Sequence, residues 1–138
     1  MPKLAPKIRP PARAAATARQ PRLRGRIAID IGTRSGLSEA GADLLEQIAI
    51  GGSLSEAARR LRYSYRWAWL LVSSMNRAWG RPLVVTATGG KRGGGARLTP
   101  LGVAVLAAYR QLQLELEHFL DLQTRPFQRA VKLPPHAS

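Results

Sequence analysis

The chain has 138 residues, a formal net charge of +14 and a pI near 11.7, and it contains no cysteine. This length favours one domain, and the charge favours a polyanionic partner, most simply nucleic acid. The composition excludes disulfides and thiolate metal sites, and no apolar run is long enough to span a bilayer. The two histidines, His118 and His136, are too few and too far apart for a metal cluster. We therefore expect no metal, no cofactor and no membrane attachment.

Residues 1–25 carry seven basic side chains, no acidic ones and five prolines. The prolines break any long helix, so this segment is interpreted as a disordered basic arm. It either attracts phosphates without sequence preference or has no role. A transit peptide is also rich in arginine, but the prolines argue against its amphipathic helix, and a secretory signal is excluded because no apolar core exists.

Residues 26–31 alternate in hydropathy, which predicts a short strand that could extend a later hairpin into a three-stranded sheet. Residues 32–36 are expected to form a loop, and Ser38 is a candidate N-cap. The helix that follows should bury Gly41, Leu44, Leu45 and Ile48 and end at Gly51-Gly52. Its acidic residues, Glu39, Asp43 and Glu46, indicate a solvated face, because no nucleophile, histidine or metal ligand accompanies them to support acid–base catalysis.

A second helix is predicted after Ser53. Ser53 and Glu56 have the spacing of a capping box, in which each side chain accepts from a backbone N–H at the start of the helix. Leu54, Ala57, Ala58 and Leu61 recur at helical spacing. Residues 62–64 leave room only for a sharp turn, and Ser64 is a plausible N-cap for a third helix.

The third helix should bury a stripe formed by Ala68, Val72, Met75 and Trp79 and should end at Gly80. Two helices joined by such a short turn match a helix-turn-helix, whose second helix reads bases in the major groove of DNA. The candidate base-reading residues are Ser64, Tyr65, Arg66, Trp67, Trp69 and Leu70. The alternative is that the aromatic residues belong to the core. DNA contact is favoured for Tyr65 and Arg66, a core position is slightly favoured for Trp69, and Trp67 is balanced between the two.

Residues 83–86 and 96–98 are predicted strands that flank a glycine-rich basic tip, residues 88–95. Such a hairpin is the wing of a winged helix-turn-helix. Its cations suit phosphates or a minor groove. The candidate backbone contacts are Ser53, Arg62, Lys91, Arg92 and Arg97. A nucleotide-binding loop is the weaker alternative, because Arg92 stands where that motif requires Ser or Thr.

The sequences Ser64-Tyr65-Arg66, Ala68-Trp69, Met75-Asn76, TATGGKRGGGA (residues 86–96) and Leu98-Thr99-Pro100-Leu101-Gly102 resemble the N-terminal DNA-binding domain of the molybdate-responsive ModE-type regulators. The LysR-type regulators are more distantly similar. The resemblance covers about residues 26–122, and the glycine-rich stretch is its specific part. It implies a winged-helix dimer that binds a palindromic operator. Full-length members of the family add C-terminal oxyanion-binding domains, which residues 123–138 are too few to form.

Thr99 and Pro100 open a last predicted helix that runs to about Leu122. One of its faces carries Leu101, Val105, Ala108, Leu112, Glu115 and Phe119. A neighbouring face carries the residues assigned to a dimer interface, which are Leu106, Tyr109, Leu116 and Leu120. The helix is apolar over too much of its circumference for the surface of a monomer, which favours a two-fold dimer over a helix that only folds back on its own domain.

The sequence therefore predicts a mainly α fold with a small β-sheet, namely a winged helix-turn-helix with a long C-terminal dimerisation helix, followed by a flexible tail over residues 123–138. The predicted function is sequence-specific binding of double-stranded DNA by a bacterial, cytoplasmic, nucleoid-associated regulator that lacks the molybdate-sensing domain. A separate partner could then supply effector sensing. Two alternatives remain: a nonspecific nucleic-acid-packaging protein, and a small oxyanion (molybdate)-binding protein that uses the Gly-Lys-Arg loop. An enzyme is not expected.

Overall fold

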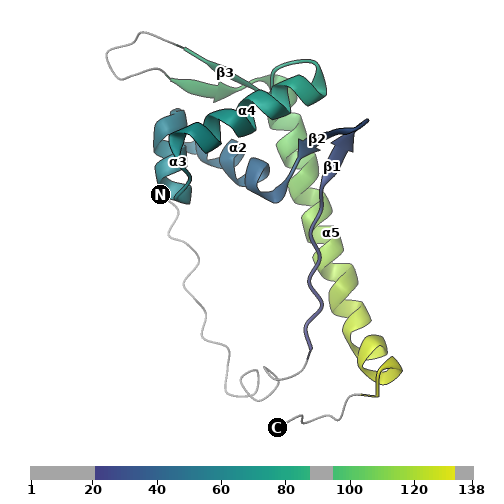
Figure 1. Cartoon of the computed structure of the whole chain (residues 1–138). Helices are drawn as coiled ribbons and strands as arrows, with labels where there is room; N and C mark the ends of the chain where they lie inside the picture. Colours follow the sequence, from purple (N-terminus) through teal and green to yellow (C-terminus); the bar gives the residue numbers. More distant parts are fainter. Residues whose placement is uncertain (1–20, 88–94, 133–138) are drawn as a thin grey trace. The chain divides into compact units, whose positions relative to one another are not determined.

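The computed structural model describes residues 21–87 and 95–132, which divide into two compact units. The first unit spans Arg26–Glu115 and contains two hairpins and most of the helices (Figure 1). Its elements are β1 (Ile29–Ile31), β2 (Arg34–Leu37), α2 (Glu39–Gly51), α3 (Leu54–Leu61), α4 (Tyr65–Trp79), β3 (Val84–Thr86) and β4 (Ala96–Leu98). Helix α5 (Pro100–Ala130) begins in this unit, and its residues from Leu116 onward belong to the second unit.

The core of the first unit confirms the predicted apolar stripes of its helices. Helix α2 buries Gly41, Leu44, Leu45 and Ile48, helix α3 buries Leu54, Ala57 and Ala58, and helix α4 buries Ala68, Val72 and Met75. Leu61 and Trp79 are half-buried and pack against this core. Three short helices with one apolar face each therefore enclose a common interior, as the helical spacing predicted.

Four helices begin at a hydroxyl side chain that accepts a hydrogen bond from a backbone N–H three residues later, as predicted. The acceptors are Ser38 (3.1 Å from Gly41 N), Ser53 (3.2 Å from Glu56 N), Ser64 (3.0 Å from Trp67 N) and Thr99 (3.0 Å from Gly102 N). The predicted capping box is only half formed. The Glu56 carboxylate pairs with the guanidinium of Arg59 at 2.8 Å and with that of Arg60 at 3.6 Å.

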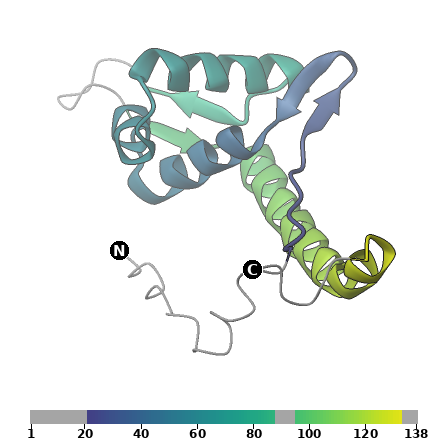
Figure 2. The same ribbon diagram turned by 60° about the horizontal axis from the view of Figure 1, so that its bottom comes forward.

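The prediction for residues 26–36 is wrong in three respects. Residues 34–36, which were expected in a loop, belong to strand β2. The preceding strand, β1, is shorter than expected, and it pairs with Arg34–Leu37 in an antiparallel sheet of its own instead of joining the wing. Gly32, with φ of +64°, closes the turn between the two strands, a conformation that glycine adopts without strain. The Trp79 indole N–H then donates to the Gly36 carbonyl oxygen at 2.8 Å and ties this hairpin to the C-terminal end of α4 (Figure 2).

The predicted wing strands are confirmed. β3 and β4 pair antiparallel, with Val84 opposite Leu98 and Thr86 opposite Ala96. The ladder continues beyond the strands, because Ala87 N–H donates to the Gly95 carbonyl oxygen at 2.8 Å. Lys91 and Arg92 lie outside the described residues.

Helix α5 is longer than predicted, because it continues past Leu122 to Ala130 with Pro126 inside it. Proline removes one N–H donor, but its fixed φ is compatible with a helix. The helical hydrogen bonds resume after it, with Val131 N–H donating to the Phe127 carbonyl oxygen at 3.1 Å. The expected boundary between helix and tail at residues 122–123 was therefore too early.

The assignment of one face of α5 to a dimer interface also needs correction. Tyr109 is completely buried in the core of the first unit, and its hydroxyl donates to the Ile27 carbonyl oxygen at 2.8 Å. Leu106 is half-buried and packs against the same core. Both residues therefore lie on the inward side of the helix. For Tyr109, the segment before β1 supplies a hydrogen-bond partner that the spacing along α5 could not reveal.

In the second unit, residues 21–25 pack against α5. A Cβ atom at Gly25 would lie 2.7 Å from Leu116 Cδ2 and 3.0 Å from Leu120 Cδ1. Leu116 and Leu120 are half-buried, so the other two residues assigned to the interface also contact their own chain. No described helix is both long enough and apolar enough to cross a membrane.

Candidate nucleic-acid interface

One face of α4 exposes large apolar side chains that a folded domain would ordinarily cover. The exposed fractions are 57% for Tyr65, 48% for Trp67, 52% for Trp69 and 42% for Leu70. The slight preference for a core position at Trp69 was therefore wrong: the buried stripe of α4 already fills the space between α4 and the other helices. Ser64 and Arg66 are exposed on the same N-terminal part of the helix, so the structure brings together all six residues predicted to read bases.

Two further features make this surface positively charged, namely the position of Arg77 and the absence of acidic residues from the surrounding sequence. Arg77 lies on the exposed face of α4, eleven residues after Arg66 and at matching helical phase; sequence reasoning noted its outward position but did not assign it a role. Residues 57–114 contain no aspartate and no glutamate. Because α4 and the wing lie within this acid-free stretch, their charge is uniformly positive, which favours a phosphate backbone as partner.

The acidic side chains of α2 are paired with arginines away from α4. Arg110 of α5 donates to Asp43 Oδ1 at 3.0 Å and to Glu46 Oε1 at 3.1 Å. Burial lowers the pKa of Arg110, but the hydrogen bond to Asp43 and the charge of Glu46 outweigh burial and hold this pKa above its usual value. None of the ion pairs among the described residues includes Arg62, Arg66, Arg77 or Arg97. These four guanidinium groups therefore remain available to an anionic partner.

Two of the residues predicted to contact the DNA backbone have structural roles. Arg62 ends α3 in the left-handed conformation, with φ of +60°, and its N–H donates to the Arg59 carbonyl oxygen at 3.2 Å. Its side chain is exposed. The Ser53 hydroxyl caps α3 and lies 3.2 Å from the Ser55 hydroxyl. Contact of either residue with phosphate stays a prediction.

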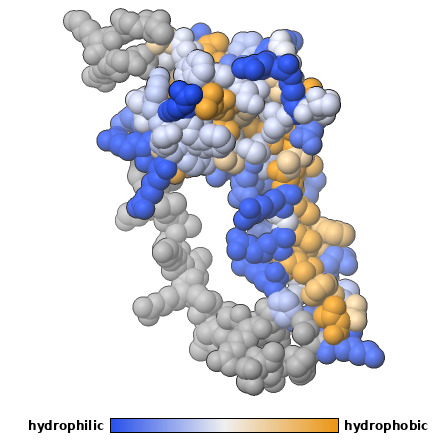
Figure 3. Space-filling model, in the orientation of Figure 1, coloured by the Kyte–Doolittle hydropathy of each residue, from blue (hydrophilic) through white to orange (hydrophobic). Residues whose placement is uncertain are grey.

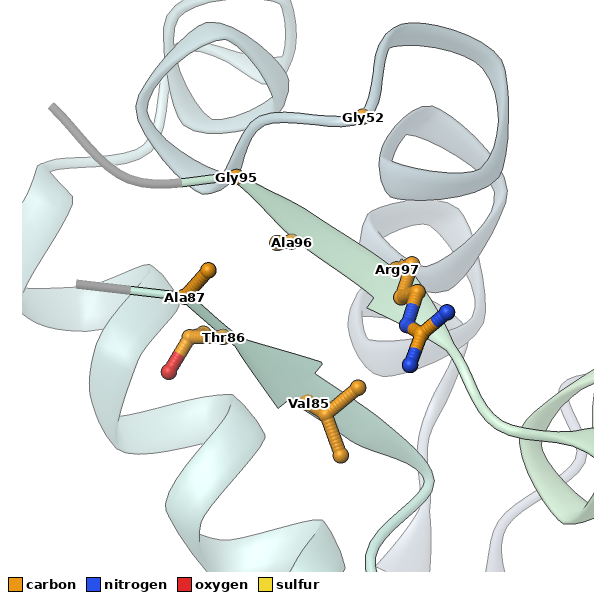
Figure 4. A pocket seen from close by; sticks show the side chains of 7 residues that line it. All are labelled: Gly52, Val85, Thr86, Ala87, Gly95, Ala96 and Arg97. Carbon is orange, nitrogen blue, oxygen red and sulfur yellow. The ribbon is translucent and has the colours of Figure 1, made fainter. Parts of the chain in front are cut away.

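The base of the wing is held on the turn between α2 and α3. Ala96 N–H donates to the Gly52 carbonyl oxygen at 2.9 Å, and Gly52 adopts a φ of +69°. A hollow of about 380 Å³ lies here and is lined by Gly52, Val85, Thr86, Ala87, Gly95, Ala96 and Arg97 (Figure 4). Among the described residues of this lining, Arg97 alone is charged. The part of its lining that the structure describes does not supply the several converging donors that an oxyanion site needs.

Sequence reasoning missed Asn76, which lies on α4 and forms hydrogen bonds to the backbone where β3 begins. The sequence offered two signals, namely the Met75-Asn76 pair within the family resemblance and an amide side chain next to the buried Met75. No group of three or more acidic, histidine or cysteine side chains in the described residues could hold a metal ion. The described surface offers a helix with exposed aromatic side chains and two exposed arginines, Arg66 and Arg77, beside a hairpin, which suits a nucleic acid.

No protein-family model matches the chain. Among curated proteins, the "Molybdenum transport protein ModE" of Azotobacter vinelandii is 38% identical over 100 residues, which are 72% of this chain and 37% of that protein. The "DNA-binding transcriptional dual regulator ModE" of Escherichia coli K12 is 44% identical over 66 residues, which are 48% of this chain and 25% of that protein. The homologues of this chain are ModE-type molybdate regulators. The match lies in their N-terminal region, and the chain spans roughly a third of their length.

A solved structure titled "Multiple Antibiotic Resistance Repressor, MarR" has a TM-score of 0.51 and 19% identity, and the alignment covers 71% of this chain and 78% of that one. At this identity the likeness shows the fold alone, a winged helix. The mainly α class with a small sheet and a long C-terminal helix is thereby confirmed. The names of the curated relatives describe transcriptional regulators and molybdenum transport or molybdenum-pterin-binding proteins, and none of these names is that of an enzyme.

Proposed function

We propose that this ModE-like chain is a DNA-binding transcription regulator that reads its operator with α4 and contacts the flanking backbone with its wing. The proposal rests on the composition of the exposed face of α4. Its exposed aromatic residues and free arginines lie within a stretch that has no acidic residue. Arginine can donate two hydrogen bonds to guanine, and apolar side chains can contact the methyl group of thymine. A surface that bound phosphate by charge alone would not need the exposed tryptophans.

We further propose that the chain binds a palindromic operator as a dimer, and that a second copy covers the exposed side of α5. Within the first unit this side exposes Ala108 and Leu112, and within the second unit it exposes Phe119 and Leu122. Figure 3 shows hydrophobic residues gathered along α5. The positions 108, 112, 115, 119 and 122 alternate in steps of four and three, the spacing with which helices pair in coiled coils. A two-fold pair of chains would present two copies of α4 to successive major grooves.

A selection from randomised duplex DNA at about 150 mM salt tests both proposals. We expect a palindrome whose half-sites are about 10 base pairs apart, because a symmetric dimer imposes its symmetry on the site. A recovered half-site without a palindrome would support DNA reading and reject the dimer. Strong binding without any motif would reject sequence reading and favour a packaging protein that uses charge alone.

The names of the curated relatives connect them with molybdenum, and we propose that the genes under this operator serve molybdenum handling. The motif recovered by selection can be searched upstream of such genes. Direct binding of an oxyanion by the Gly-Lys-Arg loop is the competing function, and that loop lies outside the described residues. Calorimetry with molybdate separates the two, and we expect no heat of binding.

A further inference from the structure

Asn76 joins α4 to the first residues of the wing through three hydrogen bonds. Its Oδ1 accepts from Leu83 N–H at 2.7 Å and from Val84 N–H at 3.3 Å, and its Nδ2 donates to the Val84 carbonyl oxygen at 3.0 Å. The amide thus uses both its acceptor and its donor on the backbone of one short segment. Leu83 is completely buried, so the point that Asn76 holds is fixed in the core.

The same segment is held from its other side by the start of α5. Thr99 N–H donates to the Leu83 carbonyl oxygen at 2.9 Å, and the Thr99 hydroxyl donates to the Pro82 carbonyl oxygen at 2.7 Å. A Cβ atom at Gly102 would overlap the Leu83 carbonyl oxygen. The backbone at Pro82–Val84, which leads into the wing, is therefore held by hydrogen bonds from Asn76 and from Thr99. Of these two residues, only Asn76 belongs to the helix proposed to read DNA.

We propose that Asn76 is a positioning residue: it sets the wing relative to α4 so that Arg66 in the major groove and Arg97 on β4 reach the same DNA site together. The proposal rests on the proposed function of the chain in binding DNA. Asn76 itself is half-buried and is committed to Leu83 and Val84. It therefore acts through the wing and contacts no base.

The amide is the group that this position requires. Aspartate would keep the acceptor for the two N–H groups but would lose the donor to Val84, and alanine would lose both. Alanine would also leave the Leu83 N–H, which belongs to a fully buried residue, without a partner. The wing should therefore be held most firmly with asparagine at position 76, less firmly with aspartate and least firmly with alanine.

A double-mutant cycle on operator affinity tests the proposal. We expect Asn76→Ala to weaken binding about tenfold on the wild-type background. On an Arg97→Ala background the loss should be less than about threefold, because the contact that a displaced wing would lose is already absent. On an Arg66→Ala background, which is the matched control on α4 itself, the tenfold loss should persist. Equal losses on both backgrounds would overturn the proposal, since a general loss of stability would not distinguish the wing from the helix.

Hydroxyl-radical footprinting supplies a readout that stability alone does not change. In the Asn76→Ala complex, protection should disappear at the edges of each half-site and persist at its centre. Loss of protection at every position in parallel would contradict the positioning role. Asn76→Asp is the second variant, in case the alanine variant does not fold, and it should give the same pattern with a smaller loss. If the wild-type chain shows no preference for the operator over a scrambled duplex, the proposed function fails. If the wild-type footprint is normal and the Asn76→Ala footprint is identical to it, the chain binds DNA but Asn76 does not position the wing.

Discussion

Helices α4 and α5 both expose large hydrophobic side chains, but their surroundings differ. On α4 the exposed residues are aromatic ones and Leu70, with Arg66 and Arg77 on the same face. On α5 the exposed residues include Leu112, Leu114, Phe119 and Leu122, and acidic, glutamine and histidine side chains stand between them. Acids repel a phosphate backbone but are tolerated around a protein contact. Hydrophobic exposure alone therefore does not identify a partner, and the charges beside it separate a DNA-facing surface from one that fits a second copy of the chain.

The largest effect is expected from a charge in the exposed row of α5. Leu112→Glu should convert a dimer into monomers and lower affinity for the palindrome by about a hundredfold, because two linked half-site contacts become independent. The control is Gln111→Glu, which adds the same charge one position away, outside the row. Sedimentation equilibrium and fluorescence anisotropy on full and half operators give the two readouts. If the Leu112→Glu chain stays dimeric, the dimer interface does not lie on this face of α5.

The second effect concerns the cations of α4. Arg66→Ala should cost about 1–3 kcal/mol of operator binding and relax specificity at one or two positions of each half-site. The control is Arg34→Ala, because Arg34 is also exposed but lies on the β1–β2 hairpin, which is tied to the C-terminal end of α4. Binding measured on a panel of operator variants distinguishes the two arginines. Similar losses for both would mean that the charge of the chain, rather than the α4 surface, governs binding.

The apolar stripes, the helix caps and the wing strands were predictable from the sequence because each is set by a local pattern. Ser38, Ser64 and Thr99 cap helices that begin next to them in the chain. The inward side of α5 was not predictable, because both of its candidate faces are apolar. The choice depends on the bond between Tyr109 and Ile27, which are separated by 82 positions. Likewise, nothing near Arg26–Ile31 showed that its strand would pair across Gly32 instead of with the wing.

The candidate DNA surface shows the same division. The charges and aromatic residues of α4 are visible in the sequence, and helical phase places most of them outward. The exposure of Trp69 required the packing of the other helices, since its position at the edge of the buried stripe fits either environment. The role of Asn76 required the fold, because its partners Leu83 and Val84 become neighbours only after Gly80 ends the helix and the chain reverses.

Two tryptophans of α4 differ in burial, since Trp79 is half-buried against the core and Trp69 is exposed. Trp79→Phe should lower the free energy of unfolding by about 1 kcal/mol, because it removes the hydrogen bond from the indole N–H to the Gly36 carbonyl oxygen. Trp69→Phe should change it by less than about 0.5 kcal/mol, because half of this side chain is in solvent. Urea unfolding followed by circular dichroism measures both. If Trp69→Phe were the more destabilising of the two, its assignment to an exposed, DNA-facing surface would have to be withdrawn.

The smallest effect tests the buried side of α5 through pH. Burial, followed by the charge of Glu39, raises the pKa of Tyr109 above its ordinary value of 10.0, although Arg110 acts in the opposite direction. The unfolded chain therefore loses this proton at a lower pH than the folded chain. The resulting stabilisation is complete below about pH 10 and is lost as the pH rises through the folded pKa, with a slope below about 1.4 kcal/mol per pH unit for one proton. Tyr109→Phe should flatten this decline between about pH 9 and about pH 11, but only in part, because the pKa of Tyr63 is also raised by burial and by Asp43. Urea unfolding at a series of pH values measures the slope, and an unchanged slope in the Phe variant would mean that the Tyr109 hydroxyl is not held inside the folded chain.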